Sequence, residues 1–255
     1  SHAAAYAVVS YQTAWLKYYY PVEYMAALMT SVIDNPGKVA EYIYSCRQMG
    51  IKILPPDINH GYSSFSVDNG SIRYGLAAIK SIGRPVIKEI VAERKANGEF
   101  KNLKDFIERM SGKDINKRTI ENFIKSGAFD ELGGTRKQFM VIYVQILDQV
   151  NREKKNSMTG QMSLFDIVGE EQKSEFDIPL PNVGEYEKST KLAFEKEVLG
   201  IYLSGHPMEE YEEQWRKGIS KTTQDFQFDE ELGFSRVSDG AAEIIGGIIA
   251  SKTIK

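Results

Sequence analysis

The chain has 255 residues, of which 42% are hydrophobic and 26% are charged, and its formal net charge is −3 at pH 7. This is an ordinary globular composition, sufficient for one large domain or two smaller ones. The single cysteine, Cys46, excludes an internal disulfide, and no run resembles a signal peptide or a membrane span, so we expect a cytosolic protein with no membrane partner. The histidines His2, His60 and His206 form no ligand-spaced pair, so we expect no metal site.

Charge is distributed unevenly along the chain. Residues 71–137 hold fifteen Lys and Arg against nine Asp and Glu, a balance of +6, whereas residues 166–215 hold four against thirteen, a balance of −9. The first region is suited to face a polyanion, and the second is most simply a solvated surface. The chain starts without a methionine and ends in the apolar run IIGGIIASKTIK, typical of a first β-strand, so we expect a piece of a longer protein.

The first fifty residues predict three helices. Residues 3–30 have apolar positions at three- and four-residue steps, with Pro21 at the first turn of a second helix. Residues 36–49 predict a third helix that begins at a proline and stops at Gly50. The first helix also carries a set of aromatic residues, namely Tyr6, Tyr11, Trp15, Tyr18, Tyr19 and Tyr20. Rings at helical spacing belong to a core more often than to a nucleotide-stacking surface, so we expect them to be buried.

The rest of the chain predicts a mainly α fold with little β-structure. Residues 65–76, FSVDNGSIRYGL, are two short alternating runs joined by Asn69-Gly70, which predicts a β-hairpin. Short helices separated by glycines follow up to Val150. Residues 151–191 have the composition of a flexible linker, and a closing helix then ends at Gly200.

Residues 75–94, GLAAIKSIGRPVIKEIVAER, predict a helix, a tight turn at Ser81-Ile82-Gly83, and a second helix that begins near Arg84. A glycine turn that leads into a helix start presents unpaired backbone N–H groups, which a phosphate can accept with help from the helix dipole. The side chains of Lys80, Arg84 and Lys88 would add positive charge there. Such contacts position a protein on a duplex without reading its sequence.

Residues 115–139, INKRTIENFIKSGAFDELGGTRKQF, form a looser copy, with Lys125 and Gly127 at its turn. Taken alone, each copy is more often an ordinary αα-hairpin. Two copies in a basic region favour a tandem helix-hairpin-helix unit that grips the DNA backbone. That motif prefers glycine where Ser81 stands, and its second turn is degenerate here.

Several catalytic patterns are missing from the sequence. We find no GxxxxGK[ST], HExxH or GxSxG motif, and no close pair of aspartates framed by strands of the kind that holds two magnesium ions. We therefore expect neither an active site nor a cofactor in this chain.

The order of the motifs resembles the catalytic alpha subunits of bacterial replicative DNA polymerase III. Residues 1–30 are similar to the end of the fingers domain in that family, and YGLAAIKSIG, IKSGAFDELG and EKEVLGIYLSGHP are similar to its later signatures, in the same order. The resemblance implies four segments: 1–60, the C-terminal part of the fingers; 61–150, a tandem helix-hairpin-helix; 151–205, a clamp-binding linker and closing helix; and 206–255, a connection into a truncated OB-fold.

The resemblance also implies a function for the parent protein, which is DNA-templated nucleotidyl transfer in the bacterial cytoplasm. In that family the magnesium-binding aspartates belong to the palm, which precedes the fingers, so the chain should be inactive alone. Ser1 and His2 would lie near the incoming nucleotide. The implied partners are double-stranded DNA, the beta sliding clamp and, through the parent chain, other replicase subunits.

The pentapeptide Gln161, Met162, Ser163, Leu164 and Phe165 matches the internal clamp-binding motif of the family. Leu164 and Phe165 would fill apolar pockets, each worth ~1.5–3 kcal/mol if fully buried, and Gln161 would hydrogen-bond at the pocket edge. The alternative is that the pair packs on its own domain.

Two other classes of function remain open from the residues. The chain could be a stand-alone DNA-repair or clamp-binding adaptor with helix-hairpin-helix units, which an upstream reading frame without paired palm aspartates would indicate. An independent enzyme is disfavoured by the missing catalytic motifs.

Overall fold

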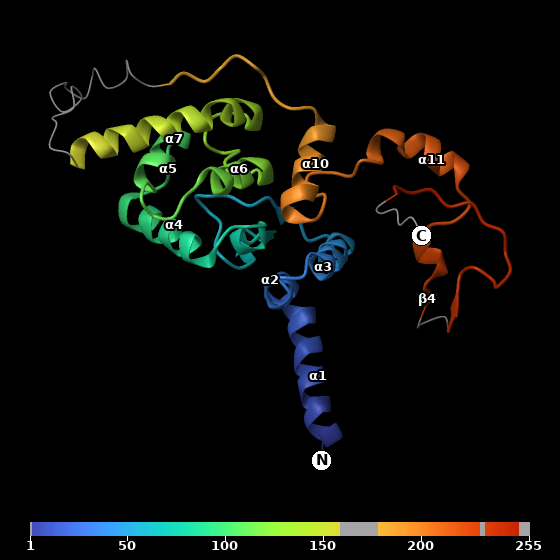
Figure 1. Cartoon of the computed structure of the whole chain (residues 1–255). Helices are drawn as coiled ribbons and strands as arrows, with labels where there is room; N and C mark the ends of the chain where they lie inside the picture. The colour runs from blue at the N-terminus through green and yellow to red at the C-terminus, as the bar shows by residue number, and fades with distance from the viewer. Residues whose placement is uncertain (1, 159–177, 230–232, 250–255) are drawn as a thin grey trace, which may run out of the picture. The chain divides into compact units, whose positions relative to one another are not determined.

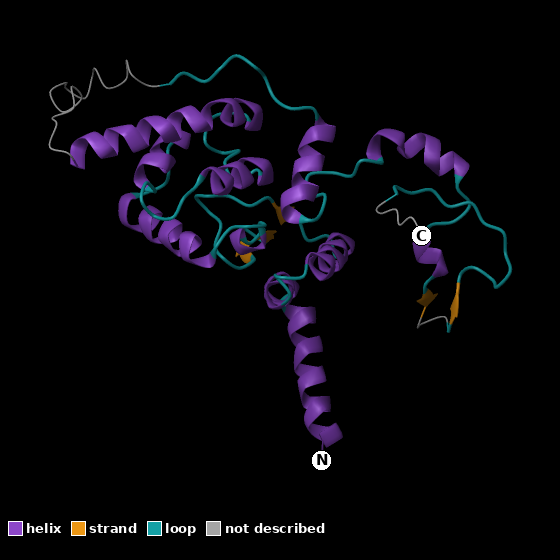
Figure 2. Ribbon diagram, in the orientation of Figure 1, coloured by secondary structure: helices purple, strands orange, loops and turns teal. Residues whose placement is uncertain are grey.

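The computed structural model describes residues 2–158, 178–229 and 233–249. These residues divide into two compact units, Ser1–Ser204 and Gly205–Lys255, and each is described by itself. Figure 2 shows mostly helices with a few short strands, which confirms the predicted mainly helical fold. Over the described ranges, no helix is both long enough and apolar enough to cross a membrane.

The first unit contains the helices and strands that build the candidate site (Figure 1). Its α-helices are α1 (His2–Tyr19), α2 (Pro21–Ser31), α3 (Pro36–Gln48), α4 (Arg84–Asn97), α5 (Leu103–Arg109), α6 (Lys117–Ser126), α7 (Arg136–Met158) and α10 (Lys188–Leu199). The strands are β1 (Ile53–Leu54), β2 (Ser66–Asp68) and β3 (Ser71–Arg73), and a short 3₁₀ helix, η1 (Leu76–Ala78), follows them.

The first three helices begin and end close to the predicted residues. Proline is at the first position of α2 and of α3, where its missing N–H costs nothing. The side chain of Asn35 caps α3 by accepting the backbone N–H of Lys38 at 3.2 Å. Gly50, just after α3, has a φ of +72°, a conformation that favours glycine.

The sheet of the first unit has the strand order β1-β3-β2, with β1 parallel and β2 antiparallel to β3. Asn69 and Gly70 join β2 to β3 with φ values of 48° and 75°. Two central residues with positive φ are the requirement of a type I′ hairpin turn, so the predicted Asn-Gly hairpin is confirmed.

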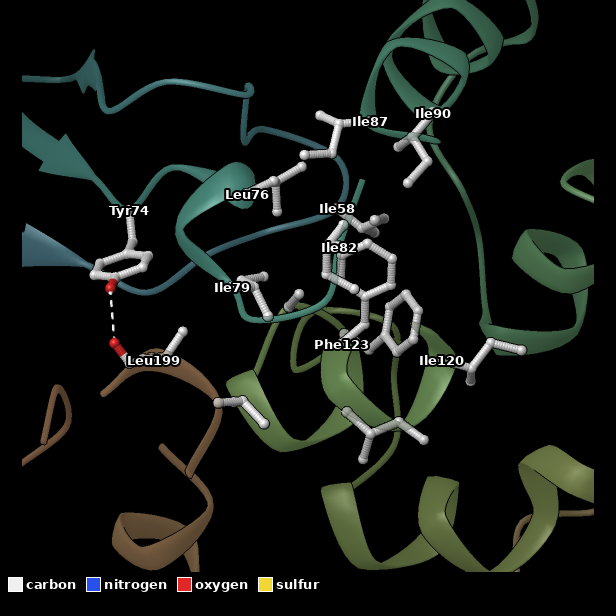
Figure 3. Packing of buried hydrophobic residues seen from close by; sticks show 14 of the residues in the cluster. Ile58, Tyr74, Leu76, Ile79, Ile82, Ile87, Ile90, Ile120, Phe123 and Leu199 are labelled. Carbon is white, nitrogen blue, oxygen red and sulfur yellow. Dashed lines mark hydrogen bonds between the residues drawn. The ribbon is translucent and has the colours of Figure 1, made fainter. Parts of the chain in front are cut away.

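One hydrophobic core joins the sheet to the helices that surround it. Figure 3 shows Ile79, Ile82, Ile87 and Phe123 converging in this core from the turn between η1 and α4, from α4 and from α6. The hydroxyl of Tyr74 lies 3.4 Å from the carbonyl oxygen of Leu199, beside the end of α10. The core thus fixes α4, α6 and α10 around the same turn.

The aromatic residues of α1 do not enter the core, so the expectation that they are buried was wrong for this chain. The exposed fraction is 69% for Tyr6, 71% for Tyr11 and 78% for Tyr18, and Trp15 is 41% exposed. Trp15 stacks instead on Tyr19 of the same helix, with ring centroids 4.8 Å apart. Helical spacing places these rings along a helix, but it does not supply a neighbour that covers them.

The predicted linker, residues 151–191, is partly helical. Helix α7 continues to Met158, and α10 already starts at Lys188. Residues 178–187 between them, which we call the strap, are irregular but hydrogen-bonded to the start of α7. Composition missed these contacts because they depend on distant partners.

The second unit is small and largely irregular. It contains η3 (Glu209–Tyr211), α11 (Glu212–Gly218), η4 (Thr223–Phe226) and two strands, β4 (Phe228–Asp229) and β5 (Phe234–Ser235), which pair antiparallel. Residues 241–255 were expected to form a first strand; of these, residues 241–249 are described, and they are not in a strand. The carbonyl of Ile244 instead accepts the N–H of Ser220 at 2.9 Å, and among the described residues no ladder forms around it.

Candidate nucleic-acid interface

The first predicted hairpin is present, but its first arm is the single 3₁₀ turn η1 rather than an α-helix. Ile79 and Ile82 are 1% and 7% exposed, so both anchor the turn in the core. Lys80, Ser81 and Gly83 are exposed on its outer side. Buried isoleucines on either side of Lys80 and Ser81 therefore direct these residues outward.

Ser81 has a φ of +64°, in the left-handed region that favours glycine. A non-glycine residue in this conformation costs roughly 1–2 kcal/mol. This energetic cost explains why helix-hairpin-helix motifs prefer glycine at this position.

The backbone N–H groups of this turn point to a role in anion binding. Within the described part of the chain, the N–H groups of Ser81 and Gly83 have no acceptor, whereas Ile82 donates to Ile79 at 3.3 Å. Arg84 follows as the first residue of α4, where N–H groups have no intrahelical partner. An anion outside the turn would meet free N–H groups and the positive end of the α4 dipole.

Three predicted cationic side chains lie around this turn. Arg84 makes an exposed ion pair with Asp34 at 3.4 Å, the two side chains being 61% and 85% exposed. Lys88 is exposed one turn later in α4, on the same face as Arg84. The ammonium of Lys80 donates to the carbonyl of Glu197 at 2.8 Å. Exposed pairs are weak, so Arg84 and Lys88 are available to a phosphate.

Lys80, which precedes Ser81, forms hydrogen bonds through both its backbone N–H and its backbone carbonyl. The N–H of Lys80 donates to the carbonyl of Val198, at the end of α10, at 2.8 Å. The carbonyl of Lys80 accepts the side-chain amide of Asn122, on α6, also at 2.8 Å. Asn122 is only 7% exposed.

An open hollow of about 500 Å³ adjoins the turn. It is lined by Lys80, Ser81, Lys117, Arg118, Glu121, Asn122, Glu197 and Val198. Lys117 and Arg118 begin α6, after its cap Asn116, and both are exposed. Lys117 pairs with Asp148 at 3.3 Å, and no described acidic side chain pairs with Arg118.

Lys117 and Arg118 were not predicted as site residues. The only local signal was a pair of basic residues directly after an asparagine cap. Their proximity to Ser81 results from the packing of α6 against the first hairpin, which local patterns do not report.

The second hairpin turn is closed by its own side chains. Gly127 ends α6 with a φ of +84° and is buried. The guanidinium of Arg136 lies against Gly127 and donates to Asp130 at 2.8 Å. The N–H of Ala128 is accepted by the carbonyl of Phe123 at 3.0 Å. This turn therefore presents fewer free N–H groups than the first.

Lys125 is also engaged internally. Its ammonium lies 2.8 Å from a carboxylate oxygen of Glu121 and 2.8 Å from one of Glu197, and its side chain is 13% exposed. Burial acts to lower the pKa of Lys125, but the hydrogen bonds to Glu121 and Glu197 outweigh it, so the pKa is raised. The ammonium is thus shared between two carboxylates beside the hollow.

The start of α7 already holds an anion from the strap. The carboxylate of Glu185 accepts the backbone N–H of Arg136 at 3.3 Å and that of Lys137 at 3.2 Å. Thr135 donates to the carbonyl of Gly184 at 2.6 Å. A carboxylate at a helix N-terminus satisfies orphan N–H groups and the helix dipole, so Glu185 stabilises the second hairpin.

The remaining predicted site residues are Ser1, His2 and the pentapeptide Gln161–Phe165. Ser1 and the pentapeptide Gln161–Phe165 lie outside the described residues. His2 is the first residue of α1. In the part of the chain that the structure covers, no group of three or more His, Cys, Asp and Glu side chains is placed to hold a metal ion.

Comparisons with known proteins place these features in context. Residues 50–139 match the family model of the helix-hairpin-helix motif. The chain is similar to proteins named DNA polymerase III subunit alpha: 42% identical over 221 residues in Vibrio cholerae, 41% over 211 in Borreliella burgdorferi and 42% over 212 in Escherichia coli K12. These matches cover 86%, 83% and 83% of this chain but only 19%, 18% and 18% of the relatives. The chain thus spans about a fifth of their length.

Proposed function

We propose that the chain is a segment of a replicative DNA polymerase alpha subunit that holds the backbone of duplex DNA without sequence preference and tethers the polymerase to the sliding clamp. The observation that carries the DNA proposal is the exposed turn at Ser81–Gly83, with its free N–H groups at the start of α4. The likeness to DNA polymerase III alpha subunits supports the parent reaction, which is DNA-templated nucleotidyl transfer.

The contacts of the first hairpin are those of a backbone clamp. The N–H groups of Ser81 and Gly83 face one phosphate, and Arg84 and Lys88 extend the positive charge along α4. Arg118, across the hollow, adds a further cation. N–H groups and cations that contact phosphates carry no base information, so binding is independent of sequence.

The two hairpins contribute unequally to this proposal. Lys125 and Gly127 complete the predicted set of DNA contacts, but Lys125 is held by two carboxylates and Gly127 is buried. We assign the main phosphate contacts to the first hairpin and a supporting role to the second.

The DNA proposal is tested by titrating the chain with duplexes of different sequence at several salt concentrations. Affinity falls by orders of magnitude between about 50 and 200 mM salt and is the same for each sequence. Arg84→Glu with Lys88→Glu removes most of the affinity. Lys52→Glu with Lys101→Glu, two exposed lysines outside the hollow, changes net charge equally and retains most of it. Affinity that ignores salt, or equal losses in both double variants, contradicts the proposal.

The clamp proposal rests on the residue types of Gln161–Phe165 and on the resemblance of the chain to the alpha subunits. Two apolar anchors on a tethered peptide give modest affinity, which becomes effective when the clamp encircles the same duplex. Leu164→Ala with Phe165→Ala abolishes capture by the beta clamp, whereas Ile167→Ala with Val168→Ala, just outside the motif, does not. Capture that survives the first double variant removes the proposal.

The nucleotide contacts of Ser1 and His2 and the division at residues 60, 150 and 205 belong to the same proposal. The sequence of the parent reading frame distinguishes this polymerase proposal from the alternative of a stand-alone adaptor. A palm with paired aspartates upstream of Ser1 supports the polymerase, and an open reading frame without one supports the adaptor.

A further inference from the structure

We infer that Asn122 is a positioning residue for the first hairpin, which acts by holding Ser81 in the left-handed conformation that the proposed phosphate contact needs. This inference rests on the proposed DNA-binding function and deepens it. Two hydrogen bonds on the backbone of Lys80 link the turn to α6 and α10.

Lys80 is bound to two helices that are far from it in sequence. Its N–H is fixed by Val198 and its carbonyl by Asn122, each at 2.8 Å. The peptide group between Lys80 and Ser81 includes that carbonyl, so the Asn122 amide restrains the plane of the peptide that enters Ser81. A restrained peptide plane limits rotation about the backbone bonds on either side of it.

Ser81 needs such a restraint because its own side chain opposes the conformation. A residue with a Cβ at a φ of +64° is strained, and such strain persists only where the surroundings over-determine it. Buried Ile79 and Ile82 hold the two sides of the turn, but neither makes a hydrogen bond to the carbonyl or the N–H of the peptide between Lys80 and Ser81. The Asn122 amide supplies the missing restraint.

Asn122 is suited to this role by its own surroundings. It is 7% exposed and lies within α6, so its amide cannot move far from the Lys80 carbonyl. Its side chain ends at the wall of the hollow, beside Ser81. A glycine at residue 81 would adopt the same backbone conformation without this help, whereas serine depends on it.

The consequence is a coupling between residues 81 and 122 in DNA affinity. Without the amide, the turn adopts the binding conformation in only a fraction of molecules, and the apparent affinity is reduced to that fraction of its intrinsic value. Loss of one net hydrogen bond corresponds to about a threefold to tenfold decrease. The decrease disappears when residue 81 is glycine.

The test is a double-mutant cycle on duplex affinity in the whole chain, with Asn122→Ala, Ser81→Gly and the combined variant. Asn122→Ala weakens binding about threefold to tenfold in the Ser81 background and less than about twofold in the Ser81→Gly background. Asn59→Ala is the matched control, because Asn59 also donates its amide to a distant carbonyl, that of Phe100, at 2.9 Å. Asn59→Ala is expected to change duplex affinity equally in the Ser81 and the Ser81→Gly backgrounds.

A purely structural role for Asn122 gives a different result. Equal losses from Asn122→Ala in both backgrounds, or no loss in either, overturn the inference and leave the DNA proposal intact. A wild-type chain that binds no duplex overturns the DNA proposal and this inference together. If Asn122→Ala does not fold, Asn122→Leu keeps the approximate size of the side chain, removes the donor without adding charge beside the hollow, and is expected to show the same coupling.

Discussion

The guanidinium of Arg136 fills the space that a Cβ at residue 127 would occupy, so Arg136 and Gly127 are complementary across the second hairpin. Arg136 is 4% exposed and also donates to the carbonyl of Lys125 at 3.2 Å. Burial acts to lower the pKa of Arg136, but hydrogen bonding to Asp130 raises it, so the side chain stays charged. A buried cation that needs the space above a glycine makes this turn specific for glycine.

Gly127→Ala is therefore expected to lower the free energy of unfolding by about 2–4 kcal/mol. The left-handed φ contributes roughly 1–2 kcal/mol, and displacement of Arg136 from its buried partners contributes the rest. Gly133→Ala is the matched control, because Gly133 has a φ of +78° and nothing within 4 Å of its would-be Cβ. Urea unfolding of both variants measures the difference. Equal losses would show that Arg136 moves aside at no cost.

Asp57 anchors the start of the loop that leads into the sheet. It is 2% exposed, and its Oδ1 accepts the backbone N–H of Asn59 at 2.8 Å and that of His60 at 2.6 Å. Asp57→Ala leaves both donors without this acceptor and is expected to lower the free energy of unfolding by about 2–4 kcal/mol. Asp57→Asn retains an acceptor oxygen and should cost less than half as much. Similar losses in the two variants would mean that the carboxylate charge, not the hydrogen bonds, matters.

Much of this fold follows from local signals in the sequence. Pro36 predicts the start of α3, and Asn69-Gly70 predicts the hairpin, because helix starts and tight turns depend on the conformations of a few adjacent residues. Gly200 likewise ends α10 in the left-handed conformation. These elements were predicted correctly because their causes lie within a few residues.

The candidate site was less predictable because its geometry is made by tertiary contacts. The basic character of Lys125 was evident, but its pairing with Glu197 joins residues 72 positions apart. The approach of Arg118 to the turn at Ser81 depends in the same way on how α6 packs. Charge pattern identifies the region that faces a polyanion, whereas packing decides which cations remain exposed.

Glu93 predicts a specific dependence of stability on pH. Hydrogen bonds from Lys113, at 2.6 Å, and Asn97, at 2.7 Å, lower the pKa of Glu93 from 4.5 to about 2. A carboxyl with a lowered folded-state pKa stabilises the fold fully above its unfolded pKa and loses that contribution as pH falls through the folded value. The stability difference between wild type and Glu93→Gln should therefore be largest above pH 5 and shrink as pH falls from about 4.5 to about 2.

Urea unfolding at several pH values measures this difference. Glu89→Gln is the control, because Glu89 lies one turn earlier in α4. Its carboxylate is 3.9 Å from the ammonium of Lys113, farther than the carboxylate of Glu93, and its side chain is 56% exposed. Its effect on stability should be small, because an exposed ion pair contributes little. A Glu93→Gln difference that does not change between pH 5 and pH 2.5 would mean that the ion pair is absent in solution.

Lys125 and Lys88 should separate fold stability from DNA binding. Lys125→Met removes the cation between Glu121 and Glu197 and is expected to cost about 1–3 kcal/mol of unfolding free energy, because two neighbouring carboxylates lose their partner. Lys88 is exposed and forms no ion pair with any described residue, so Lys88→Met should change stability by less than about 0.5 kcal/mol. If Lys88 contacts a phosphate, that variant reduces the slope of log affinity against log salt by about 1.

Thermal or urea unfolding and duplex titrations on both variants give the full comparison. The reverse pattern, with Lys125→Met stable but reduced in salt slope, would place the phosphate contact at the second hairpin. It would also mean that the lysine leaves Glu121 and Glu197 when DNA binds, since one ammonium cannot serve both carboxylates and a phosphate at full strength. The two lysines thus decide which hairpin holds the backbone, because only one of them is free to do so without breaking contacts in the fold.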